Sequence, residues 1–107
     1  MKLTMAVAVL LLYSCNAKPP VPTPPSPPIV ECKWAASTDM LYVSGYYVYR
    51  NGLRVNSIPI NALVYEDTGT TVGQTYTYYV TAYDGIRGIE SAPSNKITIT
   101  VEESLGK

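Results

Sequence analysis

The clearest alternation of polar and apolar residues covers residues 76–84. Side chains in a strand point alternately to the two faces of a sheet. One face would carry Tyr76, Tyr78, Val80 and Ala82, and the other would carry Thr77, Tyr79, Thr81 and Tyr83. β-Branched and aromatic residues dominate, and proline and glycine are absent, which favours a central antiparallel strand with one face on a core. We therefore expect the other strands to assemble around this one.

Other segments show strand patterns separated by turn residues, and we expect strands at 30–34, 45–50, 53–56, 63–66 and 96–101. Asn51-Gly52 predicts a tight hairpin turn, because both residues tolerate positive φ. Strands separated by turns every ~8–12 residues, with no helical periodicity beyond the N-terminal apolar run, predict a β-sandwich. The expected core is Val30, Cys32, Trp34, Tyr46, Val48, Leu63, Tyr65, Tyr78, Val80, Ala82, Ile97, Ile99 and Val101.

The N-terminal residues have a different composition. Lys2 precedes an apolar run at 5–13, which is shorter than the roughly 20 residues of a membrane-spanning helix and typical of a secretory signal. Leu12-Tyr13-Ser14-Cys15 resembles the bacterial lipobox, and this resemblance implies a signal peptide at 1–14 and a lipid on Cys15 that anchors the chain to a membrane. Cleavage after Ala17 is the alternative, giving a soluble chain that starts at Lys18, and an uncleaved anchor is a third.

A proline-rich segment follows the cysteine. Residues 18–28 contain seven of the nine prolines. This density favours extended polyproline II backbone, about 3.1 Å per residue. We expect residues 15–28 to form a stalk in front of a domain at 29–102, with a polar tail at 103–107; a ligand for proline-binding modules is the alternative.

Five motifs lie in order between residues 32 and 94: Cys32-Lys-Trp-Ala-Ala-Ser-Thr-Asp39, Gly45-Tyr-Tyr-Val-Tyr-Arg-Asn-Gly52, Tyr65-Glu-Asp-Thr-Gly69, Gly73-Gln-Thr-Tyr-Thr-Tyr-Tyr-Val-Thr-Ala82 and Glu90-Ser-Ala-Pro-Ser94. Together they resemble a fibronectin type III domain of bacterial secreted proteins. The resemblance implies an all-β, immunoglobulin-like antiparallel sandwich with Trp34 between the sheets and the Tyr76 hydroxyl bonded to backbone at a corner. The proline segment runs almost directly into Val30, so we expect strand A to be truncated or missing.

Charge and composition exclude several functions. Eight basic residues balance eight acidic ones, so no net charge favours nucleic acid, and the absence of histidine removes the commonest general base and metal ligand. Asp67, Asp84 and Glu90 lack the spacing of a calcium loop and are interpreted as solvated turn residues. Cys32 is interpreted as a buried, inert thiol, with a bridge to Cys15 as the alternative that lipidation would preclude. We expect no enzyme activity, no metal and no cofactor.

The strongest candidate for function is an outward set of tyrosines: Tyr47, Tyr49, Tyr79 and Tyr83. Their strands are neighbours in the expected fold, and an exposed aromatic surface stacks on sugars or takes a protein partner. Alternatively these rings are only strand surface, with cross-strand pairs worth about 0.2–1 kcal/mol each. We expect a lipid-anchored, non-catalytic module for binding or spacing at the cell envelope; the alternative is a soluble, secreted adaptor for a surface polysaccharide or a partner enzyme.

Overall fold

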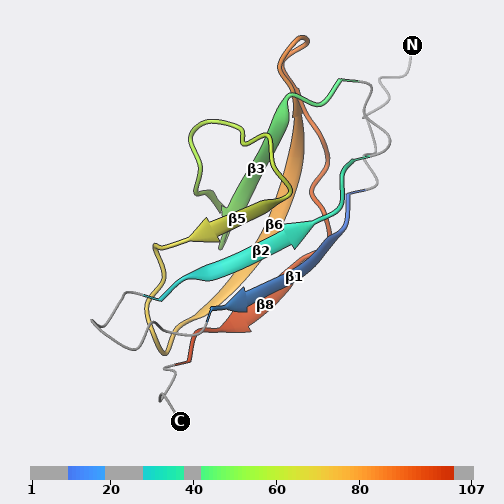
Figure 1. Cartoon of the computed structure of the whole chain (residues 1–107). Helices are drawn as coiled ribbons and strands as arrows, with labels where there is room; N and C mark the ends of the chain where they lie inside the picture. Colours follow the sequence, from blue (N-terminus) through green and yellow to red (C-terminus); the bar gives the residue numbers. More distant parts are fainter. Residues whose placement is uncertain (1–9, 19–27, 38–41, 103–107) are drawn as a thin grey trace.

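The computed structural model describes residues 10–18, 28–37 and 42–102. Within these ranges all regular structure is β-strand, arranged as two antiparallel sheets packed face to face (Figure 1). The strands are β1 (Leu12–Ala17), β2 (Val30–Trp34), β3 (Gly45–Arg50), β4 (Leu53–Arg54), β5 (Val64–Asp67), β6 (Thr75–Asp84), β7 (Ile89–Glu90) and β8 (Ile97–Thr100). The prediction of an all-β sandwich is confirmed.

The two sheets differ in size. One has three strands in the order β1-β2-β5, and the other has five, in which β4, β3, β6 and β7 follow one another and β8 also pairs with β6. β6 is the longest strand and bonds to β3, β7 and β8. It has no proline, so every residue keeps a backbone donor for the strands on either side. The predicted central strand therefore organises the larger sheet.

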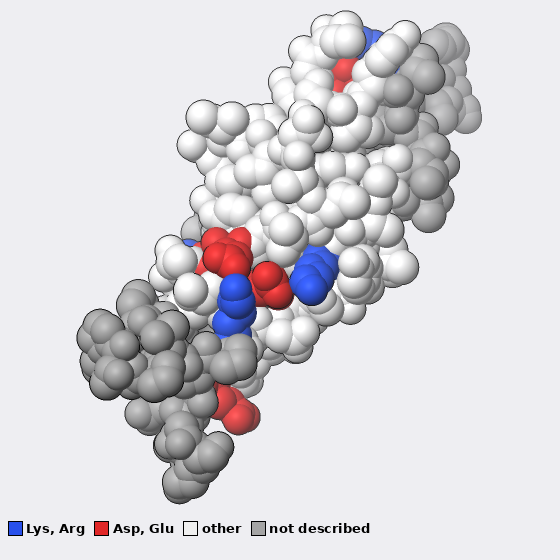
Figure 2. All heavy atoms as spheres, viewed as in Figure 1, with Lys and Arg blue, Asp and Glu red and all other residues white. Residues whose placement is uncertain are grey.

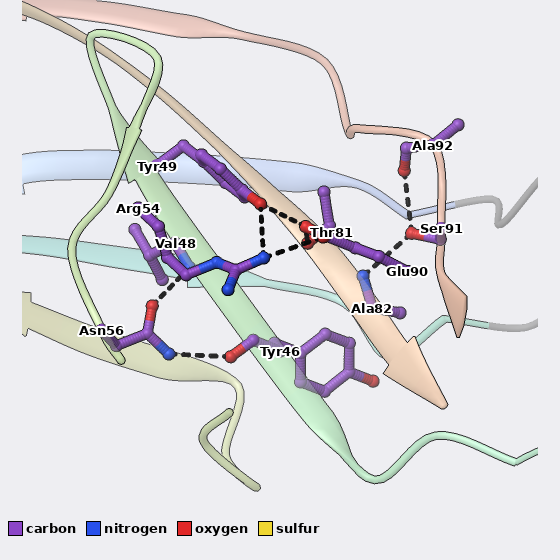
Figure 3. Close-up of polar contacts among 10 residues, drawn as sticks. All are labelled: Tyr46, Val48, Tyr49, Arg54, Asn56, Thr81, Ala82, Glu90, Ser91 and Ala92. Carbon is purple, nitrogen blue, oxygen red and sulfur yellow. Dashed lines mark hydrogen bonds and ion pairs between the residues drawn. The ribbon is translucent and has the colours of Figure 1, made fainter. Parts of the chain in front are cut away.

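A tight turn joins β3 to β4. Asn51 and Gly52 have φ of 52° and 82°, the positive values that a two-residue hairpin turn requires. β4 ends at Arg54, earlier than predicted, because the Asn56 side chain turns inward and takes over the bonding of the ladder (Figure 3). Its Oδ1 accepts from Val48 N at 2.7 Å, and its Nδ2 donates to Tyr46 O at 3.0 Å.

The core lies between the sheets and is centred on Trp34, which is fully buried. Its ring meets the ring of Tyr46 edge-on, with centroids 5.7 Å apart. The predicted core is wrong at Leu63, which is 43% exposed. The inward positions of β5 are Tyr65 and Asp67. Continued alternation would also point Leu63 inward, but the strand begins only at Val64, so the alternation does not apply to Leu63.

Asp67 is buried and bridges the two sheets, which corrects its interpretation as a solvated turn residue. Its carboxylate accepts hydrogen bonds from the Tyr78 hydroxyl at 2.6 Å and from Arg50 Nη1 at 2.8 Å. Burial by itself raises the pKa of this carboxyl, but the bonds from Tyr78, Arg50 and the Gly69 N–H outweigh it and hold the pKa below the usual value. Asp67 is therefore a charged tie between β5 and the larger sheet.

The turn before β6 is closed by a tyrosine. The Tyr76 hydroxyl accepts a hydrogen bond from the Thr71 backbone N–H at 2.9 Å. This is the corner contact that the family resemblance implies for Tyr76.

The prediction that strand A is truncated or missing is wrong. β1 pairs antiparallel with β2 from Leu12↔Trp34 to Ala17↔Val30, with a bulge between Leu12 and Ser14. Leu10, Leu12 and Cys15 are buried, so the apolar run assigned to a signal also has the inward positions of a bulged strand. The sandwich therefore begins before the predicted boundary at residue 29. Residues 1–9 and 19–27, which hold most of the predicted signal peptide and stalk, lie outside the described residues.

Cys15 and Cys32 face each other in this pairing and form a disulfide that spans 17 positions of sequence. The interpretation of Cys32 as an inert free thiol is therefore wrong, and the bridge that had been the alternative is present. The sulfur of Cys15 cannot hold both this bond and a lipid.

Candidate functional site

Tyr47 and Tyr49 on β3 and Tyr79 and Tyr83 on β6 share the outer surface of the larger sheet, and we call these four residues the tyrosine face. Tyr49 and Tyr79 are direct cross-strand partners, and their rings stack with centroids 4.7 Å apart and planes 9° apart. Tyr47 and Tyr83 meet edge-on at 5.4 Å. The structure thus brings the four rings together as two cross-strand pairs.

The tyrosine face is less open than a bare aromatic surface. Arg54 reaches across from β4, and its guanidinium carbon lies 3.7 Å from the Tyr47 ring centroid and 5.7 Å from that of Tyr49. Tyr47 keeps only 7% of its surface exposed. The Lys96 ammonium lies 5.7 Å from the Tyr79 centroid. Cations therefore contact both pairs and hold them by cation–π attraction.

A carboxylate closes the network at one edge of the tyrosine face. Glu90 on β7 accepts hydrogen bonds from the Tyr49 hydroxyl, from Thr81 Oγ1 at 2.5 Å and from Arg54 Nη2 at 2.9 Å (Figure 3). Burial and the bond to Glu90 raise the pKa of Tyr49, so its hydroxyl stays protonated as a donor.

Sequence reasoning missed the roles of Arg54, Thr81 and Glu90. Arg54 and Glu90 lie on the short strands β4 and β7, next to β3 and β6 in the sheet. Counting outward positions on flanking strands could have found Arg54 beside Tyr49, its cross-strand partner. The β7 pairing has no comparable signal, because the strand has only two residues.

Asp84 is fully buried, and Glu90 is half-buried on β7, so the interpretation of these two residues as solvated turn residues is also wrong. Asp67, Asp84 and Glu90 each pair with an arginine, namely Arg50, Arg87 and Arg54. In the part of the chain that the structure describes, no three histidine, cysteine or acidic residues gather as metal ligands. No helix there is long and apolar enough to cross a membrane.

The outer surface of the three-stranded sheet is charged, whereas that of the five-stranded sheet is aromatic. Lys18 Nζ lies 2.6 Å from Glu66 and 3.9 Å from Glu31, and Lys33 lies 3.9 Å from Glu31. Figure 2 shows these alternating charges side by side over that sheet. They offer a ligand no surplus of either sign.

No family model matches the chain, but curated relatives do. The match to chitinase Chi52 of Paenibacillus xylanexedens is 42% identical over 71 residues, 66% of this chain and 13% of that protein. A poly(3-hydroxybutyrate) depolymerase of Ralstonia pickettii is 40% identical over 76 residues, 71% of this chain and 14% of that protein. Exoglucanase B of Cellulomonas fimi is 39% identical over 69 residues, 64% of this chain and 6% of that protein. The chain thus spans about a seventh or less of these relatives.

Solved structures resemble the chain over more of its length. The fibronectin(III)-like modules of Clostridium thermocellum CbhA superpose with a TM-score of 0.61 at 17% identity, covering 88% of this chain and 96% of that one. The fold is that of a fibronectin type III-like module. A β-1,2-glucanase of Parabacteroides distasonis contains a similar region, with a TM-score of 0.68 at 20% identity over 94% of this chain and 13% of that one. The expected immunoglobulin-like sandwich of the fibronectin type III kind is confirmed, and at these identities the likeness concerns the fold.

Proposed function

We propose that the chain is a non-catalytic fibronectin type III module that works outside the cell, where it contacts surface polymers through its tyrosine face. The observation that carries this proposal is the cluster of four tyrosine rings held rigid by Arg54, Lys96 and Glu90. Rigid aromatic rings provide contact area at a low entropic cost, and their faces suit the apolar faces of sugar rings. A protein partner would use the same rings.

The relatives support a non-catalytic role. Their names belong to a chitinase, an exoglucanase and a polyester depolymerase, and each shares only a small segment with this chain. Enzymes with such different substrates would not use one segment for their chemistry. An accessory role that depends little on the polymer's identity fits these names better.

Spacing is the second candidate function, and the polar bonding of the tyrosine face favours it. The Tyr49 hydroxyl and the Glu90 carboxylate are engaged within the module, and Tyr47 is buried, so few groups remain to orient a ligand. A spacer needs stability and length but no binding site. In this case the tyrosines serve only to strengthen the sheet.

A membrane-anchored form is a proposal supported by the lipobox-like Leu12-Tyr13-Ser14-Cys15. In that form residues 1–14 are removed, Cys15 carries lipid, and the module stands on a proline-rich stalk at the cell envelope. The anchored form lacks the Cys15–Cys32 bond and the buried Leu10 and Leu12. The intact mass of the secreted protein distinguishes a lipid on Cys15 from a soluble chain that starts at Lys18, the alternative adaptor form.

The binding function is tested by retention of the purified chain on insoluble chitin, cellulose and starch. We expect weak retention that persists in salt, because no net charge drives it, and its loss in a Tyr49→Ala, Tyr79→Ala double variant that still melts cooperatively. The matched control is Thr98→Ala, Thr100→Ala, on an exposed part of the same sheet where these side chains pair with Thr77 and Thr75 and not with a ring. Equal retention of the Tyr double variant and wild type, or no retention of wild type at high concentration, would leave spacing as the function.

A further inference from the structure

Everything that holds β1 in place lies on later segments of the chain. Its backbone pairs with β2, and its sulfur bonds to Cys32. The Asn95 side-chain amide bonds to the backbone of Leu12 as a neighbouring strand would. Its Oδ1 accepts from Leu12 N at 3.0 Å, and its Nδ2 donates to Leu12 O at 2.9 Å. An identical strand from another molecule would find the same ladder, the same amide and the same sulfur.

When β1 and β2 belong to one molecule, the two ends of the connection between them must meet. Lys18 N donates to Ile29 O at 2.8 Å, so the two ends of the connection lie side by side. Between these two residues the sequence has seven prolines. Proline fixes φ and favours extended backbone, in which ten residues span about 31 Å. The composition of the connection thus opposes the tight return that pairing within one chain demands.

We propose that two copies of this chain exchange β1 and form a dimer in which Cys15 of each copy is bonded to Cys32 of the other. The exchanged dimer keeps the ladder, the amide contacts and the disulfide of β1, and the two ends of the proline-rich connection then need not meet within one molecule. Exchange of an identical element is a low-cost route to dimers. Association costs translational entropy, so the dimer fraction increases with protein concentration.

The covalent step needs an oxidant. Each intermolecular bond forms from two cysteine thiols, which lose two protons and two electrons to a small-molecule disulfide such as oxidised glutathione, itself reduced to two thiols. A dimer contains two such bonds. Its cysteine connectivity is identical to that of the monomer, so only the origin of the two halves differs.

The test is refolding of the full 107-residue chain. Equal amounts of unlabelled and ¹⁵N-labelled chain are reduced, mixed, refolded with oxidised and reduced glutathione at several concentrations, and digested without reduction. Exchange predicts a Cys15–Cys32 peptide with one light and one heavy half, at up to half of the total and increasing with concentration. The undigested protein should show a dimer band that reducing agent abolishes.

A connection variant separates the proposal from random oxidation. Replacing Pro19, Pro20, Pro24 and Pro25 with serine keeps the length of the connection, and we expect it to lower the mixed peptide several-fold at equal concentration. The control Pro93→Ser, outside the connection, should leave the mixed fraction unchanged. A Cys15–Cys32 peptide that is all-light or all-heavy at every concentration would overturn the proposal, as would mixed Cys15–Cys15 or Cys32–Cys32 peptides in equal amount.

Discussion

The two sheets of the sandwich are held together by different means. The five-stranded sheet is built on β6, which forms a hairpin with β7 and also pairs with β3 and β8. Its outer surface is an aromatic network of ring pairs and two cations. The three-stranded sheet contains a disulfide between β1 and β2 and exposes ion pairs. The larger sheet thus relies on aromatic side chains, whereas the smaller sheet relies on a disulfide and on charged groups, and each of these ties can be removed separately.

The largest effect is expected at Trp34, where the smaller sheet packs on the larger. Trp34→Ala should cost about 3–5 kcal/mol, because it empties the centre of a small core and so removes most of the stability of such a domain. Urea unfolding measures this loss. Leu63→Ala is the control and should change stability by less than about 0.5 kcal/mol, because Leu63 lies outside the core. A Trp34→Ala variant with a urea midpoint close to that of wild type contradicts the packing described here.

The next effect concerns the Cys15–Cys32 tie. Its loop of 17 positions predicts a loss of about 3 kcal/mol in Cys15→Ala. Cys32→Ala and the double variant should lose the same amount, because each removes the same bond. Additive losses in the double variant would indicate two independent cysteines instead of one disulfide.

Asp67 tests the charged tie between the sheets. Asp67→Asn should cost about 2 kcal/mol at neutral pH, the size of hydrogen bonds to a charged group. The folded pKa of Asp67 lies below the usual value of 3.8, so its contribution to stability is complete above about pH 4 and declines as pH falls through the folded pKa. Unfolding measured between pH 2 and 7 should show a shallower acid decline in Asp67→Asn. If Asp67→Asn lost stability at low pH as steeply as wild type, other carboxylates would be the cause of that loss.

A smaller effect is expected within the tyrosine face. A double-mutant cycle of Tyr49→Ala and Tyr79→Ala should give a coupling of about 0.5–1.5 kcal/mol, as stacked rings do. Tyr49→Phe keeps the ring and loses only its hydroxyl bonds, so it serves as the control for the polar network. Zero coupling would mean that the stack contributes nothing to the larger sheet.

The smallest effect belongs to the charged surface of the other sheet. Lys18→Ala removes ion pairs between exposed groups and should leave the urea midpoint of unfolding close to that of wild type. Any small change should diminish further in added salt. A loss of stability as large as that of Asp67→Asn would show that the two outer surfaces are not as different as described.

The larger sheet could be predicted from sequence, because its signals are local. The alternation in β6, the pattern of β3 and the Asn51-Gly52 turn each need only a few neighbouring residues. The grouping of the tyrosines follows from the pairing of β3 with β6 in the expected fold. Arg54 and Glu90 were missed because their positions depend on how short strands flank the ladder.

The smaller sheet could not be predicted fully, because β1 and the partners of Asp67 give no local signal in the sequence. The bulge in β1 breaks the alternation that would identify a strand, and the apolar residues before it have the composition of a secretory signal. Asp67 looks like a turn residue until Arg50 and Tyr78 are brought to it by the other sheet. Such partners become visible only in three dimensions.

The most direct test of this account is hydrogen exchange at β1 in the full chain with its disulfide intact. β1 either completes the three-stranded sheet or is absent from it, and backbone amides report the difference. We expect the amides of Leu12, which donates to Asn95, and of Lys18, which donates to Ile29, to exchange slowly together with β2, and to exchange faster after reduction of the disulfide. Exchange of these amides at the rate of an unstructured peptide while β6 stays protected would contradict the account.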